Sequence, residues 1–69
     1  MRVLIIGASG FIGQHLRRRL VQEPGFDVAS TYNSRVPEDV DSSWYPLEIA
    51  DHGRLEQIFL KSRPEVVVL

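Results

Sequence analysis

An unbroken apolar run, Val3-Leu4-Ile5-Ile6, leads directly into a segment with glycine at every third position, Gly7, Gly10 and Gly13. Apolar residues then recur at helical spacing as far as about Gln22. A buried strand, a glycine-rich turn and the start of a helix, in this order, predict one βα unit of a parallel sheet. The free N–H groups and the dipole at the start of such a helix favour an anion, so the segment is a candidate pyrophosphate site.

The glycine spacing leaves two interpretations open. It reads G-x-x-G-x-x-G, whereas the familiar dinucleotide fingerprint is G-x-G-x-x-G. A structural turn that binds nothing would also use glycine, but the strand before the motif and the helix after it favour the nucleotide interpretation. We expect Gly7 to make the tight turn, Gly10 to let the backbone approach the pyrophosphate, and Gly13 to let the helix pack closely.

The rest of the chain continues the alternation of strands and helices. The apolar patterns predict four strands and two helices: strands at Val3–Ile6, Asp27–Tyr32, Trp44–Leu47 and Glu65–Leu69, and helices at about Phe11–Gln22 and from an N-cap at Asp51 to Ser62. We expect Ile12, Leu16 and Leu20 to form the apolar stripe of the first helix, and Leu55, Ile58 and Phe59 that of the second. Right-handed crossovers then predict a parallel sheet of strand order 3-2-1-4.

Composition excludes several functional classes. The 69 residues carry a net charge of −1 and no cysteine, which excludes a disulfide scaffold and a thiolate metal site within them. His15 and His52 lack partners at ligand spacing, so no metal site is expected. No apolar run approaches the ~18 residues of a membrane helix, and no basic patch suggests nucleic acid. We expect a cytoplasmic protein, and we expect Arg17-Arg18-Arg19 to form a solvated helix face.

The segment from Arg2 to Gly13 resembles the opening of the extended short-chain dehydrogenases/reductases, the NAD(P)-dependent sugar-nucleotide epimerases, dehydratases and reductases. The resemblance covers the whole chain but only the beginning of such an enzyme. It implies the N-terminal half of a doubly wound Rossmann fold, in which residues 1–69 form the NAD(P)-binding segment of a longer protein. It also implies backbone contacts to the phosphates around Phe11 and Ile12, with Ser9 at the helix entrance.

The end of the second predicted strand indicates which cofactor binds. An acidic residue there would hold the ribose 2′-hydroxyl of NAD, whereas an arginine would accommodate the 2′-phosphate of NADP. The chain has Tyr32, Asn33, Ser34 and Arg35 at this point and no acid. We therefore expect NADP(H), with NAD(H) as the alternative. Arg35 would otherwise be an ordinary solvated loop charge.

A second resemblance lies after the third predicted strand. Leu47-Glu48-Ile49-Ala50-Asp51 is similar to a Leu-Asp-Ile-Thr-Asp-like segment of extended reductases. The resemblance implies that Glu48 holds the adenine amino group and that Ile49 packs on the ring. A surface glutamate is the alternative for Glu48, because its side chain is one methylene longer than the usual aspartate.

No catalytic residue can be named within these residues. The family uses a Tyr-x-x-x-Lys pair, but Val36 and Ile49 stand four residues after the two tyrosines. The segments around Tyr32 and Arg63 look most like dTDP-4-dehydrorhamnose reductases, which transfer a hydride to a 4-keto sugar nucleotide. An NAD-dependent epimerase or dehydratase, and a non-catalytic regulatory protein such as the related subunit of methionine adenosyltransferase, stay open. The expected partners are the dinucleotide and, in the intact protein, a sugar nucleotide; homodimer formation is left open.

Overall fold

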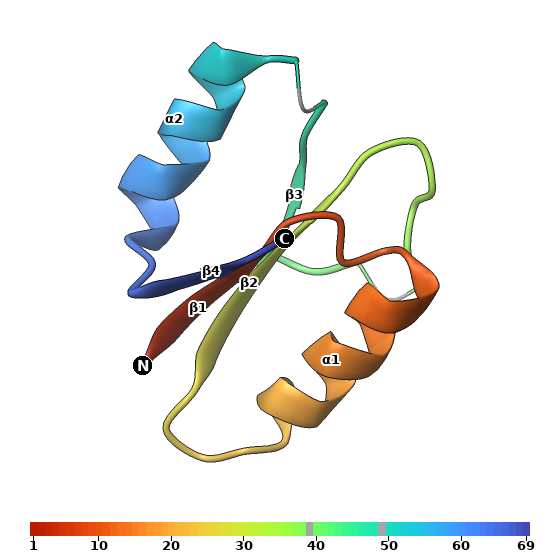
Figure 1. Cartoon of the computed structure of the whole chain (residues 1–69), viewed down its shortest axis with the longest axis vertical. Helices are drawn as coiled ribbons and strands as arrows, with labels where there is room; N and C mark the ends of the chain where they lie inside the picture. Colours follow the sequence, from red (N-terminus) through yellow and green to blue (C-terminus); the bar gives the residue numbers. More distant parts are fainter. Residues whose placement is uncertain (39, 49) are drawn as a thin grey trace.

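Four strands form one parallel sheet in the order β3-β2-β1-β4, which confirms the predicted strand order. The computed structural model describes residues 1–38, 40–48 and 50–69. The strands are short and follow the predicted positions to within two residues: β1 Arg2–Ile5, β2 Asp27–Tyr32, β3 Trp44–Pro46 and β4 Val66–Val68. The two helices, α1 Phe11–Val21 and α2 His52–Ser62, lie on opposite faces of the sheet (Figure 1).

Alternation along β1 divides the core into two parts, one under each helix. Val3 and Ile5 point to the α1 face, where they pack with Val28 and Trp44. Leu4 points to the other face and packs with Ile58 of α2. Because the central strand is buried on both faces, it is apolar at consecutive positions rather than at alternate ones.

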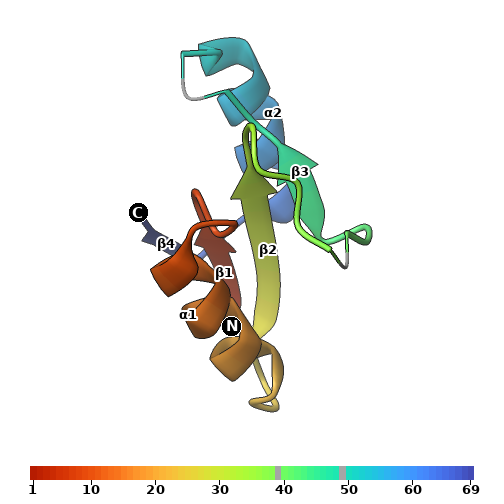
Figure 2. The same cartoon turned by 90° about the vertical axis from the view of Figure 1, so that its right-hand side faces the viewer.

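The carboxyl ends of the strands meet at one edge of the sheet. In the parallel register, Ile5 lies opposite Ser30 of β2 and Val68 of β4. The glycine turn follows β1 at this edge, between the ends of β2 and β4 (Figure 2). This is the switch point of a doubly wound sheet, where such folds bind their ligands.

The predicted apolar stripe of α1 is partly wrong. Leu16 and Leu20 pack against the core beneath α1, but the Ile12 side chain is 80% exposed. The second predicted stripe is confirmed, because Leu55, Ile58 and Phe59 all lie in the core beneath α2. Helical spacing places Ile12 on the same face as Leu16, but Ile12 lies in the first turn of α1, where it borders a hollow at the ends of β1 and β4 instead of packing against the core.

The prediction that the arginine run is solvated is wrong for Arg17, which is only 7% exposed. Its guanidinium lies 4.6 Å from the ring centroid of Trp44. Its Nη2 is 3.3 Å from Ser43 Oγ and 4.0 Å from Asp41 Oδ2. The hydroxyl and the N–H of Ser43 hold the pKa of the Asp41 carboxyl below its usual value, with a smaller effect of Arg17. We call Arg17, Asp41, Ser43 and Trp44 the Arg17 clip.

The Arg17 clip fastens the long β2–β3 connection to α1. Pro37, in the middle of this connection, is buried as well. The connection therefore covers the α1 face of the sheet beside β2, although it contains no helix among its described residues.

None of the described helices is long and apolar enough to cross a membrane.

Replacing Arg17 by alanine should lower the free energy of unfolding by about 1–2 kcal/mol, because a desolvated cation–π contact and the packing of the side-chain stem are both lost. Urea unfolding of the intact protein measures this change. Arg19→Ala is the matched control, since Arg19 is exposed and forms a surface ion pair with Glu23, just beyond the end of α1. Its change should stay within about 0.5 kcal/mol. Equal losses in the two variants would show that the Arg17 clip adds nothing.

Candidate functional site

Hydrogen bonds to the end of β2 hold the glycine turn in place. Gly7 has a φ of +77°, a value that favours glycine, and its N–H donates to Thr31 Oγ1 at 2.9 Å. The next N–H, of Ala8, donates to the Thr31 carbonyl at 2.9 Å. The turn is then closed by the N–H of Gly10, which donates to the Gly7 carbonyl at 3.2 Å. One residue of β2 thus fixes the turn above β1.

The start of α1 lies directly on this turn. A Cβ atom at Gly13 would come within 2.8 Å of Ala8 Cα and 2.9 Å of the Gly7 carbonyl oxygen, so no larger residue fits without movement. This contact agrees with the packing role predicted for Gly13. A Cβ at Gly10, by contrast, would meet only the Gly7 oxygen, at 3.6 Å. The fold itself therefore does not require glycine at position 10.

The two helices begin in different ways. The side chain of Asp51 caps α2 by accepting a hydrogen bond from the N–H of Arg54 at 3.0 Å. Gly10 occupies the same position at α1, and no side-chain cap is formed there within the described residues. The first N–H groups of α1 are thus available to an external acceptor such as a phosphate oxygen.

Phe11 and Ile12, in the first turn of α1, are both largely exposed. Phe11 is 77% exposed. It forms an edge-to-face contact with His15, at 4.7 Å between ring centroids. Ser9 is buried, and its carbonyl accepts a hydrogen bond from the Gln14 side chain.

Two hollows adjoin the glycine turn, and a third lies further along α1. A hollow of about 470 Å³ lies between the turn and the ends of β1 and β4, with Gly7, Gly10, Phe11, Ile12 and Gly13 in its wall. A smaller one of about 100 Å³ is lined by Gly7 and by Tyr32 and Asn33 at the end of β2. Along α1, Arg35 lines a third hollow of about 680 Å³.

The site residues predicted from the sequence thus lie at one sheet edge, with differences among them. The glycine segment, Tyr32 and Asn33 share walls of adjoining hollows, and Arg35 lies beyond them. Ser34 is exposed next to Asn33, and Glu48 is exposed beyond the end of β3. Ile49 lies outside the described residues. Direct contact of each with a cofactor stays a prediction.

Sequence reasoning missed Thr31, which is 2% exposed and accepts two hydrogen bonds from the turn. Its side chain receives one of them and its carbonyl the other. Position in the register could have indicated it, because Thr31 lies one residue past the partner of Ile5 and so faces the first turn residues.

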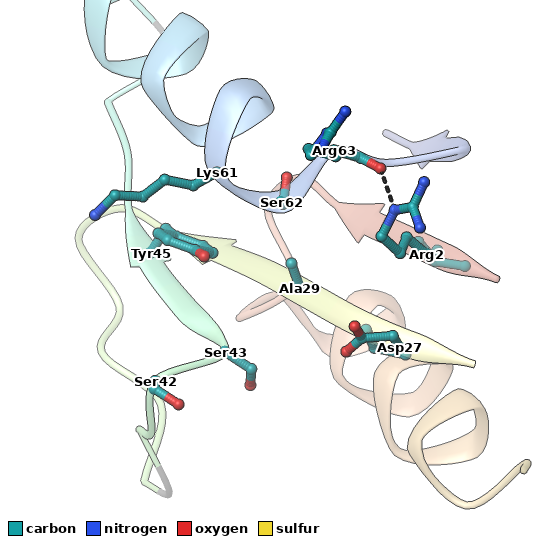
Figure 3. Close-up of a pocket in the computed structure, with 11 residues that line it drawn as sticks. Arg2, Asp27, Ala29, Ser42, Ser43, Tyr45, Lys61, Ser62 and Arg63 are labelled. Carbon is teal, nitrogen blue, oxygen red and sulfur yellow. Dashed lines mark hydrogen bonds between the residues drawn. The ribbon is translucent and has the colours of Figure 1, made fainter. Parts of the chain in front are cut away.

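The polar hollow shown in Figure 3 lies at the opposite edge of the sheet. It has a volume of about 500 Å³ and is bounded by Arg2, Asp27 and Ser43 near the starts of three strands, and by Lys61 and Arg63 at the end of α2. Open α/β sheets bind ligands at the carboxyl edge of their strands. Moreover, the Arg2 side chain already donates to the Arg63 carbonyl across this hollow. It is therefore not the candidate dinucleotide site.

The sequence and the fold both match known proteins. Residues 3–69 match the model of the NAD dependent epimerase/dehydratase family. The protein CapI of Staphylococcus aureus is 30% identical over an alignment of 80 positions, which covers 99% of this chain and 24% of CapI. A crystal structure described as a hypothetical dTDP-4-dehydrorhamnose reductase from Sulfolobus tokodaii is 39% identical, with a TM-score of 0.74, over 97% of this chain and 22% of that one.

A further crystal structure, of an epimerase candidate from Burkholderia cenocepacia J2315, has a TM-score of 0.75 at 25% identity. It is matched over 96% of this chain and 23% of its own length. The chain thus spans about a quarter of the length of each of these three relatives. The similarity lies in the dinucleotide-binding fold and does not extend over a whole relative.

Alanine at Gly10 and at Gly13 should have opposite effects. Gly10→Ala should keep the free energy of unfolding within about 0.5 kcal/mol yet weaken binding of a nicotinamide dinucleotide, titrated as NADPH, at least about tenfold. The reason is that the methyl group would occupy the open side of the turn. Gly13→Ala should destabilise the protein by about 1–3 kcal/mol through overpacking. Urea unfolding and calorimetric titration with NADPH measure the two effects. Unchanged NADPH affinity in Gly10→Ala would indicate a turn that serves packing alone.

Thr31→Val should weaken NADPH binding and lower the free energy of unfolding by about 1–3 kcal/mol, because the Gly7 N–H loses its acceptor at a site that is partly buried. Thr31→Ser is the matched control, since it keeps the hydroxyl, and it should retain most of the stability and affinity. The same two measurements apply. A serine variant as weakened as the valine variant would mean that the methyl group of Thr31, and not its hydroxyl, supports the turn.

Proposed function

The chain belongs to the NAD-dependent epimerase/dehydratase family, and from this premise we propose that it is the NADP(H)-binding segment of a sugar-nucleotide oxidoreductase. The proposed reaction of the intact protein is hydride transfer from NADPH to a 4-keto sugar nucleotide, of the kind catalysed by dTDP-4-dehydrorhamnose reductase. The observation that carries the proposal is the uncapped start of α1, which lies on a glycine turn at the switch point of the sheet.

The residues present fit a dinucleotide. Gly10 leaves the turn open on its outer side, and the first N–H groups of α1 can donate to pyrophosphate oxygens. Tyr32 and Asn33 line the adjoining hollow, where the adenosine ribose would lie. When bound, the nicotinamide supplies or accepts the hydride, while these residues hold and orient the cofactor.

The residues after β2 favour NADP(H) over NAD(H). No acidic residue follows Thr31 before Glu38, so no carboxylate stands at the positions that normally bind the ribose 2′-hydroxyl. A carboxylate there would repel a 2′-phosphate, and its absence removes this penalty. Arg35 supplies a guanidinium close by, on the exposed part of the loop.

The substrate class rests on similarity. The structure from Sulfolobus tokodaii, titled as a hypothetical dTDP-4-dehydrorhamnose reductase, is 39% identical to this chain over nearly all of it. The family description, which names epimerases and dehydratases, supports the alternative of an NAD-dependent epimerase or dehydratase. Incubating the intact protein with NADPH and a dTDP-4-keto-6-deoxy sugar distinguishes the two. Net oxidation of NADPH supports the reductase, whereas conversion of a sugar nucleotide without net oxidation supports the alternative.

Arg35→Ala should raise the dissociation constant for NADPH roughly tenfold and leave that for NADH nearly unchanged, because a charge-assisted contact to the 2′-phosphate is lost. Calorimetric titration of the intact protein with each cofactor measures both constants. Equal weakening of both cofactors would mean that Arg35 orders the loop. No change in either would mean that Arg35 lies in solvent and that the proposed NADP(H) preference has another origin.

A further inference from the structure

A hollow lies between α1 and the loop that follows β2. Gln14 and Arg18 form the helix side of this hollow of about 680 Å³, and Arg35, Val36, Pro37 and Glu38 form the loop side. Two arginines, one from each side, therefore face the same space. A single carboxylate, Glu38, accompanies them among the described residues.

Arg18 differs from its neighbours in the arginine run. Arg17 is buried in the Arg17 clip, and Arg19 forms an ion pair with Glu23 at 3.1 Å. Arg18 is exposed toward the hollow and forms no ion pair with any residue in the part of the chain that the structure describes; the same holds for Arg35. Two guanidinium groups and one carboxylate, Glu38, leave a net positive charge around this hollow. A dianionic ligand would offset that charge and the repulsion between the two guanidinium groups.

The loop side of the hollow is held against α1. The Arg17 clip holds Ser43 and Asp41 of the connection against α1. Arg18 follows Arg17 directly in this helix. Pro37 is buried and, together with Trp44, lines a small gap between the loop and Arg17. The separation between α1 and the residues around Arg35 is therefore set by packing, so the two arginines can act on one ligand.

We propose that Arg18 is a second specificity-determining residue, which contacts the 2′-phosphate of NADP(H) from the helix side while Arg35 contacts it from the loop. This inference rests on the proposed NADP(H) function. Two guanidinium groups match the charge of a phosphate monoester close to −2, and each can donate two hydrogen bonds to its oxygens. Arg18 is fixed at its backbone by α1, whereas Arg35 lies on an exposed loop.

The test uses glutamine, which keeps most of the side-chain length but removes the charge. Arg18→Gln should raise the dissociation constants for NADPH and for adenosine 2′,5′-bisphosphate about three- to tenfold, as expected for a partly exposed charge pair. The constant for NADH should stay unchanged. Arg19→Gln, one residue further along α1, is the matched control and should change none of the three constants. Calorimetric titration of the intact protein supplies all of them.

Two results would overturn the inference without touching the proposed function. In the first, Arg18→Gln leaves NADPH affinity unchanged while Arg35→Gln weakens it, which would show that Arg35 alone binds the 2′-phosphate. Alternatively, Arg18→Gln could weaken NADPH and NADH equally, so that Arg18 acts through the stability of α1. An unsubstituted protein that binds NADH as tightly as NADPH would instead overturn the NADP(H) proposal and, with it, the role of Arg18.

Discussion

The close contact between Gly13 and the backbone of Gly7 and Ala8 is the constraint on which the rest of the site depends. Because no Cβ atom separates them, α1 begins directly on the turn that ends β1. Thr31 fixes the same turn from the side of β2 through two hydrogen bonds. The helix start is thereby held at the switch point of the sheet, with its first N–H groups directed outward and without a side-chain cap.

The two helices show that this open start is specific to α1. Both helices have 11 residues, and each covers a different face of the sheet, but α2 begins with the carboxylate of Asp51 as its cap. A cap stabilises a helix by about 1 kcal/mol, and α1 forgoes it at the one place where the parallel fold would put a ligand. A phosphate would supply the missing acceptor, so cofactor binding and helix stability would be coupled here.

Much of the fold could be predicted because its signals are local: apolar runs mark the strands, and glycine and Asp51 mark the helix starts. The exposure of Ile12 and the burial of Arg17 could not be predicted, because both depend on what the folded chain places beside each part of α1. The Trp44 ring that receives Arg17 comes from 27 residues further along the chain. The role of Thr31 could not be predicted for a similar reason, since it depends on the register between β1 and β2.

The most direct test of the glycine turn as a dinucleotide site is backbone amide NMR of the intact protein during titration with NADPH. If the uncapped start of α1 holds the pyrophosphate, the largest shift changes should occur at the amides of residues 10–13, with smaller ones at Tyr32 and Asn33. Changes confined to the opposite edge of the sheet, around Arg2 and Lys61, would contradict this assignment, as would a saturating titration that leaves the amides of residues 10–13 unmoved.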